Sequence, residues 1–353
     1  MTPATTPVQR PADARLLTIG ADGAISHLRR SAFASQLRPA DLVIANDAAT
    51  IPASLFGVHQ RTGQRLEARL AGRGSLAFED LTFSAVLFGE GDHRTPTERR
   101  PPPPEVRAGD TLVLGPLAAR IEAVLDHPRF VRLACLGGAA ATWAGIAAHG
   151  RPVQYAYMAQ PLALWDVWTP IAGPPAAFEP PSAGFAIDWA TLGEIRWQGA
   201  SFATLTHAAG LSSAGDLALD ARLPLPEAYR IAASTAAAIQ RAKALGGCII
   251  AVGTTVTRAL EHAAALHGRV AAGEGLADQR LGPTTPLRVV DAILSGTHEP
   301  GGSHYDLLGA FADEDALAQA DTELEARGYR THEFGDSVLI WRRPSPARAQ
   351  QAA

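Results

Sequence analysis

The chain has 353 residues, of which 47% are hydrophobic and 19% charged, and its formal net charge is −4. This composition is globular, and at roughly 150 residues per domain the length predicts about two domains. The acidic balance counts against a large nucleic-acid interface, which depends on clustered Lys and Arg. Cys135 and Cys248 share no CxxC motif, which excludes a disulfide framework and a zinc ribbon. With no signal pattern and no long apolar run, a cytoplasmic location and no membrane contact are expected.

Two apolar runs near the N-terminus predict strands of a buried sheet. The first is Leu16–Ile19, which ends at Gly20, and the second is Asp41–Asp47. The polar end of the second run, Asn46 and Asp47, either faces a ligand at a sheet edge or forms a turn through side-chain bonds to the backbone. The sequence leaves both interpretations open.

The pattern changes between residues 55 and 145. Short alternating runs of apolar and polar residues are separated by Gly, Pro and charged residues, which is typical of antiparallel strands. The runs are Arg65–Leu70, Thr82–Phe88, Thr111–Leu114 and Arg129–Leu136. They predict a small antiparallel β domain at 55–145, inserted into a main domain of residues 1–54 and 146–342, with a disordered tail at 343–353.

The middle of the chain combines a long loop with further regular elements. Gln154–Tyr157 predicts a strand, and a segment rich in proline and tryptophan follows from Pro161 to Trp189. Ordered loops of this length usually carry function. Thr204–His207 predicts another strand, and helical spacing of apolar residues predicts a helix from about Pro226 to Leu245.

The strongest local pattern is a strand, a tight turn and a helix between Cys248 and His267. Cys248–Val252 is a short apolar run typical of a buried strand, and a helical pattern begins directly after Gly253, Thr254 and Thr255. Such a turn presents free backbone N–H groups and two hydroxyls at the carboxyl end of a strand, where polar ligands bind in parallel sheets. The alternative is that one of the threonines only caps the helix.

The C-terminal part continues the alternation of strands and helices. Gly273–Gly275 predicts a loop without the dinucleotide fingerprint, Arg288–Leu294 a buried strand, and the glycine-rich loop after it a helix from about His304. Ser337–Trp341 predicts the last strand. The alternation predicts an α/β main domain with a mixed, largely parallel sheet.

Several segments match one family when taken together and in order. They are Asp41–Asp47 with Ile51–Ala53 and Leu55–Gly57, Pro181–Gly184, Thr206–His207 with Gly210, Ile250–Thr255 with Arg258 and Leu260–Glu261, Val290–Asp291 with His298 and Pro300, and Tyr329–Arg330 with Phe334–Asp336. In these segments the chain resembles the S-adenosylmethionine:tRNA ribosyltransferase-isomerases of queuosine biosynthesis. The resemblance spans nearly the whole chain and implies an α/β domain with a small inserted β-barrel. It also implies transfer of the ribosyl moiety of S-adenosylmethionine, as co-substrate, to a 7-aminomethyl-7-deazaguanine in tRNA, with loss of adenine and methionine.

The chain also departs from the family pattern at several places. Ala49 and Ser54 stand where the family carries arginines, Ala186 replaces a histidine, Arg222–Pro226 replaces a His-x-Met-His run before Glu227, and Glu299–His304 replaces a Leu-Pro-Lys-Ser-Thr pattern. The chain therefore resembles a divergent paralogue. Two alternatives follow: an enzyme that uses S-adenosylmethionine on a small molecule instead of tRNA, and a non-catalytic binding protein on the same fold.

The resemblance implies a base and an orienting pocket, because the sulfonium acidifies the neighbouring C5′ protons. His207 and His298, each next to glycine-rich chain at a predicted strand end, are the acid/base candidates, or are merely hydrogen-bonded there. Asp291 accepts a hydrogen bond from the cofactor ribose or forms a turn. His298 and His304 lack zinc spacing, so no metal site is expected.

The candidate ligand-binding residues come from the same motifs. They are Asn46, Asp47, Ser182, Ala183, Gly184, Phe185, Gly253, Thr254, Thr255, Arg258 and Glu261. Arg258 and Glu261 either hold a charged group such as the methionine moiety or form an exposed pair of small energetic value. Trp165, Trp168 and Phe185 either stack on a base or pack within the loop.

Overall fold

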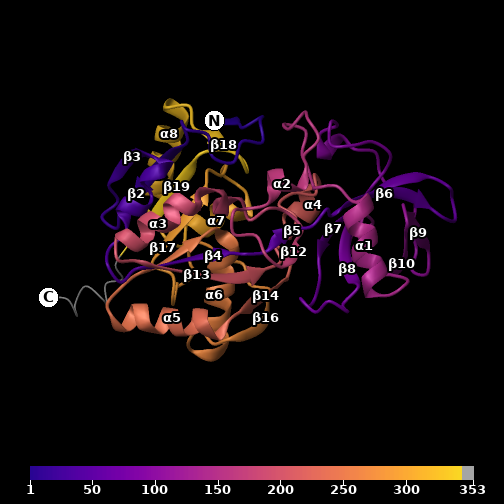
Figure 1. Cartoon of the computed structure of the whole chain (residues 1–353). Helices are drawn as coiled ribbons and strands as arrows, with labels where there is room; N and C mark the ends of the chain where they lie inside the picture. Colours follow the sequence, from indigo (N-terminus) through magenta and orange to yellow (C-terminus); the bar gives the residue numbers. More distant parts are fainter. Residues whose placement is uncertain (344–353) are drawn as a thin grey trace.

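The computed structural model describes residues 1–343, and most of the predicted tail lies outside the described residues. Figure 1 shows a small β-barrel beside a larger α/β body. The barrel lies within residues 54–135, α1 and α4 pack on it, and the larger body contains most of the other regular elements. The fold class expected from the sequence is confirmed, whereas the domain boundaries at 54 and 145 stay a prediction.

The barrel is closed and antiparallel, in the order β10-β11-β8-β7-β6-β9. Its strands are β6 (Ser54–His59), β7 (Arg65–Gly72), β8 (Thr82–Phe88), β9 (Thr111–Leu114), β10 (Leu117–Val124) and β11 (Phe130–Cys135). The four predicted runs correspond to β7, β8, β9 and β11. The sequence analysis predicts neither β6 nor β10, and β10 is separated from β9 only by Gly115 and Pro116. Closure leaves the barrel without a free edge and buries one apolar face of every strand.

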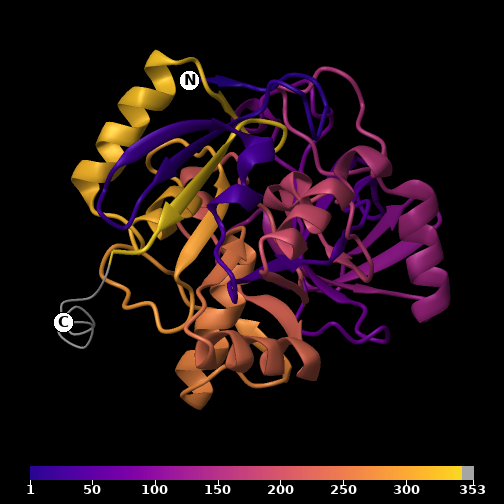
Figure 2. The same ribbon diagram turned by 60° about the vertical axis from the view of Figure 1, so that its left-hand side comes forward.

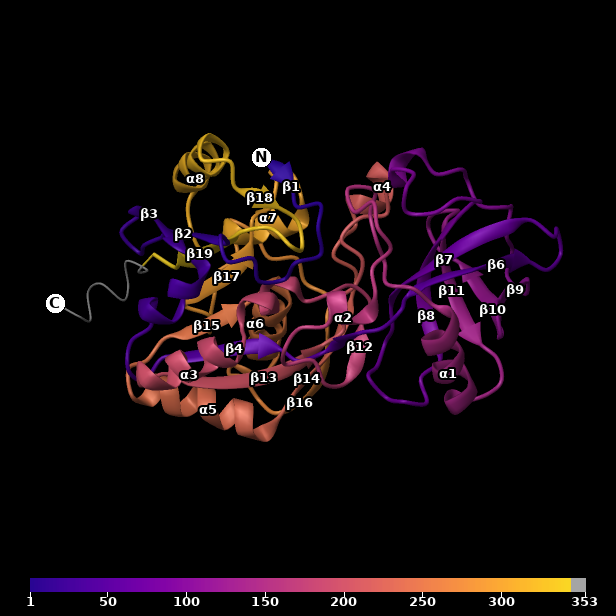
Figure 3. The same ribbon diagram turned by 45° about the horizontal axis from the view of Figure 1, so that its top comes forward.

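The larger body is built on a nine-stranded mixed sheet in the order β16-β14-β13-β4-β15-β17-β19-β2-β3. The strands are β2 (Arg15–Ile19), β3 (Ile25–Arg29), β4 (Leu42–Asn46), β13 (Ser201–His207), β14 (Glu227–Ile231), β15 (Ile249–Val252), β16 (Gly273–Ala277), β17 (Ala292–Gly296) and β19 (Ser337–Trp341). The central four, β13, β4, β15 and β17, are parallel. Their carboxyl ends point toward the barrel (Figure 3).

Both faces of this sheet are covered, as a parallel core requires. On one face, side chains such as Ile249 and Ala251 pack against α5 (Ala233–Ala244), α6 (Thr254–His267) and α8 (Glu314–Ala326). On the other face, Ile250 and Val252 pack among residues of α3 (Trp189–Trp197) and of short 3₁₀ helices. Figure 2 shows α8 (yellow) lying beside the edge of the sheet to which β2 belongs.

Short elements complete the fold. They are the strand pairs β1 (Thr2–Pro3) with β18 (Arg330–Thr331) and β5 (Ala49–Thr50) with β12 (Pro175–Ala177), and the helices α1 (Ala139–His149), α2 (Leu164–Val167), α4 (Leu217–Asp220) and α7 (Ser303–Leu308). The 3₁₀ helices are η1 (Arg30–Ala32), η2 (Ala34–Gln36), η3 (Thr97–Arg99) and η4 (Ser182–Ala186). Within residues 1–343, none of the helices has the length and apolar character needed to cross a membrane.

Three element predictions were wrong. The predicted helix from Pro226 begins instead with β14, and only α5 is helical, because pairing with β13 and β16 determines the conformation of residues 227–231. Gly273–Gly275 is not a loop, since it lies within β16 at the sheet edge. Gln154–Tyr157 is a turn rather than a strand, with the N–H of Met158 donating to the carbonyl of Tyr155 at 3.0 Å.

Candidate functional site

Four strand ends define the candidate site at the carboxyl edge of the main sheet. His207 ends β13, Asn46 ends β4, Gly253 follows β15, and His298 lies two residues after β17. These four strands are neighbours, so the outer two are separated by three strand spacings, roughly 14 Å. The structure therefore brings together segments that are more than 250 residues apart in the sequence.

Asn46 and Asp47 hold the ends of β4 and β13 together. The Asn46 amide donates to the carbonyl of His207 at 2.9 Å and accepts from the N–H of His207 at 3.0 Å. The Asp47 carboxylate accepts from the hydroxyls of Thr204 and Thr206, both at 2.7 Å. These bonds fix the position of His207, and a ligand-binding role for Asn46 and Asp47 stays a prediction.

The turn at Gly253 leaves the start of α6 without a side-chain cap. Gly253 is the N-cap residue with φ +94°, and no side-chain hydrogen bond caps this end. The interpretation that Thr254 or Thr255 caps the helix is therefore wrong. A side chain on Gly253 would place its Cβ 3.4 Å from the Cβ of Ala183, so η4, with Ser182 and Gly184, packs against the turn. An uncapped helix N-terminus favours a negatively charged group.

His207 lies fully buried next to an ion pair. Its Nε2 is 3.5 Å from a carboxylate oxygen of Glu227, which in turn pairs with the guanidinium of Arg258. Burial and then the charge of Arg258 hold the pKa of His207 well below 6.5, so the imidazole is neutral at pH 7. Neither ring nitrogen has a hydrogen-bond partner among the described residues. A neutral imidazole has one unprotonated ring nitrogen, which can accept a proton.

His298 lies in a second group at the end of β17. Its Nε2 is 2.9 Å from the hydroxyl of Ser295, and its ring centroid is 4.9 Å from that of His304. Burial, and then the neighbouring His304 and His332, lower the pKa of His298 well below 6.5. The side chain is half-buried, which leaves it accessible to a ligand. Among residues 1–343, no three His, Cys, Asp or Glu side chains are arranged to hold a metal ion.

Two predicted site residues lie away from this edge. Asp291 precedes β17, at the opposite end of the strand, where its carboxylate accepts from the N–H of Ile249 at 3.0 Å and from Arg342 at 2.9 Å. Glu261 accepts three backbone N–H bonds, from residues 288–290, at 2.7–2.9 Å. Both carboxylates therefore hold the backbone near the start of β17. This argues against the predicted roles of Asp291 in catalysis and of Glu261 in ligand binding.

Arg258 does not pair with Glu261, and neither side chain is exposed, so the interpretation as an exposed pair is wrong. The guanidinium of Arg258 donates to Glu227 and, at 2.7 Å, to the carbonyl of Ala277. It thereby ties α6 to β14 and β16. Binding of a charged ligand by Arg258 would compete with these buried contacts.

The aromatic candidates divide by burial. Phe185 is fully buried and stacks on Phe334 with ring centroids 5.4 Å apart, so its ring faces are not available to a base. Trp165 is 76% exposed. Trp168 is 43% exposed and donates its indole N–H to the carbonyl of Thr50 at 2.8 Å, which agrees with loop packing.

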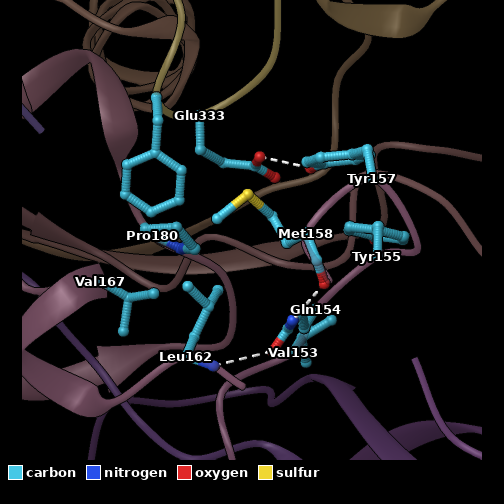
Figure 4. Close-up of a pocket in the computed structure, with 10 residues that line it drawn as sticks. Val153, Gln154, Tyr155, Tyr157, Met158, Leu162, Val167, Pro180 and Glu333 are labelled. Atoms are coloured by element: carbon cyan, nitrogen blue, oxygen red, sulfur yellow. Dashed lines mark hydrogen bonds between the residues drawn. The ribbon is translucent and has the colours of Figure 1, made fainter. Parts of the chain in front are cut away.

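A pocket between the carboxyl edge and the barrel contains groups that the sequence analysis did not select. It is small and partly open to solvent, and it is lined by Tyr155, Tyr157, Met158, Pro180 and Glu333 among others. Figure 4 shows Tyr157 donating to Glu333 at one side of the pocket and the side chain of Gln154 holding the loop at the other. The two tyrosine rings stack with centroids 6.1 Å apart.

Glu179, next to Pro180, is a buried carboxyl group of this region whose pKa is strongly raised. It accepts from the hydroxyl of Tyr155 and, at 3.1 Å, from the N–H of Ser212. Burial raises its pKa from 4.5 to about 7, against the opposing hydrogen bond from Tyr155 and with help from the charge of Glu333. A carboxyl titrating near neutral pH suits acid/base chemistry. The only sequence signal for it was a carboxylate inside a long ordered loop.

We expect Glu179 to make the protein less stable as pH rises. Because its native pKa lies above 4.5, the native state binds more protons than the unfolded chain between pH 4.5 and 7. Its contribution is therefore fully present below pH 4.5 and is lost by pH 7, an effect of roughly 3 kcal/mol. In urea unfolding between pH 4.5 and 7, the free energy of unfolding should decrease less with rising pH for Glu179→Gln than for the wild type. The variant Glu90→Gln, at an exposed site, should keep the wild-type pH dependence of stability. An unchanged pH dependence in Glu179→Gln would contradict the raised pKa of Glu179.

Comparison with known proteins identifies the family. Residues 2–340 match the family described as queuosine biosynthesis protein. The chain belongs to this family. Among its relatives, the S-adenosylmethionine:tRNA ribosyltransferase-isomerase of Citrifermentans bemidjiense is 32% identical, covering 95% of this chain and 94% of the relative. The protein of the same name from Anaeromyxobacter dehalogenans is 31% identical, covering 94% of each.

The fold of the family also agrees with a solved structure. The crystal structure of S-adenosylmethionine tRNA ribosyltransferase from Thermotoga maritima matches with a TM-score of 0.51 and 22% identity, covering 96% of both chains. At this identity the match supports the fold. The match covers both the barrel and the α/β body.

Proposed function

We propose that the protein is an S-adenosylmethionine-dependent ribosyltransferase-isomerase that acts on a 7-aminomethyl-7-deazaguanine-type acceptor in tRNA, with loss of adenine and methionine. The observation that carries this proposal is the convergence of β13, β4, β15 and β17 on the uncapped turn at Gly253. The names of relatives that match almost the entire chain support the same activity.

The residues at this edge fit a sulfonium nucleoside with an amino-acid moiety. The N-terminus of α6 offers backbone N–H groups and positive partial charge to a carboxylate, without a competing side-chain cap. The absence of a Cβ at Gly253 lets Ala183 of η4 pack close to the turn, which brings the two segments to one surface. We therefore assign Gly253–Thr255 and Ser182–Gly184 to binding of the co-substrate.

The reaction also needs a base, because the sulfonium acidifies the adjacent C5′ protons and one of them must be removed. His298 is neutral at pH 7 and half-buried, so its imidazole can reach a ligand at the carboxyl edge. His207 is neutral too but fully enclosed. We assign the proton transfer to His298 and give no such role to His207, whose backbone is held at the end of β13 by Asn46.

The test is the release of adenine, measured by chromatography, from S-adenosylmethionine with tRNA carrying the 7-aminomethyl-7-deazaguanine base. We expect release with this tRNA, and a decrease of at least about 100-fold for His298→Ala, since general base catalysis contributes 10²–10⁴-fold. His267→Ala changes an exposed histidine at the far end of α6 and should retain wild-type release. Wild-type turnover by His298→Ala would refute the assignment of the base.

A second candidate is the same transfer to a small-molecule acceptor. The formal net charge of −4 favours it, since tRNA binding usually relies on a basic surface. The same chromatographic measurement separates the two, because adenine would then be released with the free 7-aminomethyl-7-deazaguanine base and not with tRNA.

A further inference from the structure

A second pocket lies where the barrel meets the linker of residues 151–162. We call it the junction pocket, and its polar lining includes Ser54, Glu67, Arg69, His93 and Arg151. It shares Gln154 and Leu162 with the pocket of Figure 4 and so adjoins it. None of its charged residues belongs to the carboxyl-edge site.

Arg69 of β7 is the deepest group in the junction pocket. Its side chain is 1% exposed, and its Nε donates to Glu67 at 2.7 Å. The rings of Phe88 and Tyr155 lie 4.8 and 5.6 Å from the guanidinium carbon. Nη1 is buried without a hydrogen-bond partner among the described residues. A buried guanidinium N–H without an acceptor is uncommon, and an oxygen ligand would satisfy it.

The charges around Arg69 do not balance within the pocket. The carboxylate of Glu67 also accepts from Nη1 of Arg100 at 2.5 Å and from the hydroxyl of Ser54 at 2.7 Å. Two buried guanidinium groups therefore share one carboxylate. The carboxyl of Glu179 interacts with Arg69 as well but is bonded to Tyr155 and Ser212 and does not line the pocket. Positive charge in excess favours an anion.

Two further groups face the same space from other segments. Nε2 of His93, from the loop after β8, is buried without a partner among residues 1–343. Arg151, from the linker, is exposed, and its guanidinium carbon lies 5.5 Å from the ring of Phe56. Donors that come from three segments suit a tetrahedral anion better than a planar carboxylate, which a single guanidinium can bind in bidentate fashion.

We propose that the junction pocket binds a phosphate group through Arg69, His93 and Arg151. The group is either a phosphodiester of an RNA backbone or a free phosphate monoester. This inference does not depend on the proposed transfer reaction, because it concerns residues outside the carboxyl edge and is tested by binding alone.

The test is calorimetric titration of the full-length protein with inorganic phosphate at constant ionic strength. We expect one saturable site. Its affinity for phosphate should fall about tenfold in Arg151→Ala and in His93→Ala, because each variant removes one hydrogen-bond donor to the anion. Both variants leave the Glu67–Arg69–Arg100 contacts in place. Arg65→Ala removes the same charge from an exposed position of β7 and should bind phosphate as the wild type does. No saturable heat, or unchanged affinity in both pocket variants, would overturn the proposal.

A fluorescence-anisotropy arm distinguishes the two sources of phosphate. If an RNA phosphodiester occupies the pocket, a labelled single-stranded RNA is displaced by inorganic phosphate and its affinity falls in Arg151→Ala but not in Arg65→Ala. If a free monoester occupies it, phosphate binding responds to the variants and RNA binding does not. Activity need not be measured, so failure here is distinct from failure of the proposed function.

Discussion

Replacing Glu227 with alanine is expected to lower the free energy of unfolding by about 3–5 kcal/mol, the usual cost of leaving a buried charge without its partner. Arg258 is only 3% exposed and would lose its ion pair with the carboxylate of Glu227. The N–H of Gly210 would also lose its acceptor. Urea unfolding monitored by tryptophan fluorescence measures the change.

Two further variants separate the ion pair from general effects of substitution. Glu274→Ala removes an exposed carboxylate on the neighbouring strand, 4.0 Å from Arg230, and should cost less than about 1 kcal/mol. The double variant Glu227→Ala with Arg258→Met should recover part of the lost stability, because no unpaired charge remains. A small effect of Glu227→Ala alone would show that the pair does not hold α6 on β14.

Replacing Gly253 with alanine is expected to reduce adenine release at least about 100-fold, because a displacement of about 1 Å in a positioned reactant can have this effect. At φ +94° a side chain is strained by roughly 1–3 kcal/mol, and its Cβ would contact Ala183. Relief of that strain moves the turn or η4, which together form the proposed binding surface. Adenine release at saturating S-adenosylmethionine measures the effect.

Gly268→Ala is the matched control. It places a methyl group at the other end of the same helix, at φ +70° and with no atom within 4 Å. We expect a comparable loss of stability, about 1–2 kcal/mol, with wild-type adenine release. Equal losses of activity in the two variants would mean that Gly253 acts only through the stability of α6.

The elements at the carboxyl edge could be predicted because their signals are local. The apolar run before Gly253 and the helical pattern after it are confirmed as β15 and α6. Thr204–His207 and Asp41–Asp47 contain the ends of β13 and β4. A short apolar run that ends in polar residues specifies a buried strand without knowledge of its neighbours.

The sequence analysis places Asp291 inside a strand because it predicts the start of that strand four residues before its true start. The predicted strand Arg288–Leu294 has Asp291 at its centre, whereas β17 runs from Ala292 to Gly296. Residues 288–290 bond instead to Glu261, an interaction between segments that no local pattern reveals. Because β17 begins at Ala292, Asp291 lies directly before it, at the amino edge of the sheet.

The junction residues were missed for a different reason. In β7 the alternation places Glu67 and Arg69 on the face opposite Leu66 and Ala68, which is the usual pattern of a solvent-exposed face. In the structure both are buried, because the linker and the loop before Pro180 cover that face. The sequence of a strand indicates which side chains share a face but not what covers it.

Calorimetric titration of the wild-type protein with S-adenosylmethionine tests most directly whether the carboxyl edge around Gly253 is a co-substrate site. We predict saturable binding of one molecule per chain, weakened about tenfold or more in Gly253→Ala and unchanged in Gly268→Ala. Absence of heat up to millimolar S-adenosylmethionine, or equal affinity in the wild type and Gly253→Ala, would contradict it.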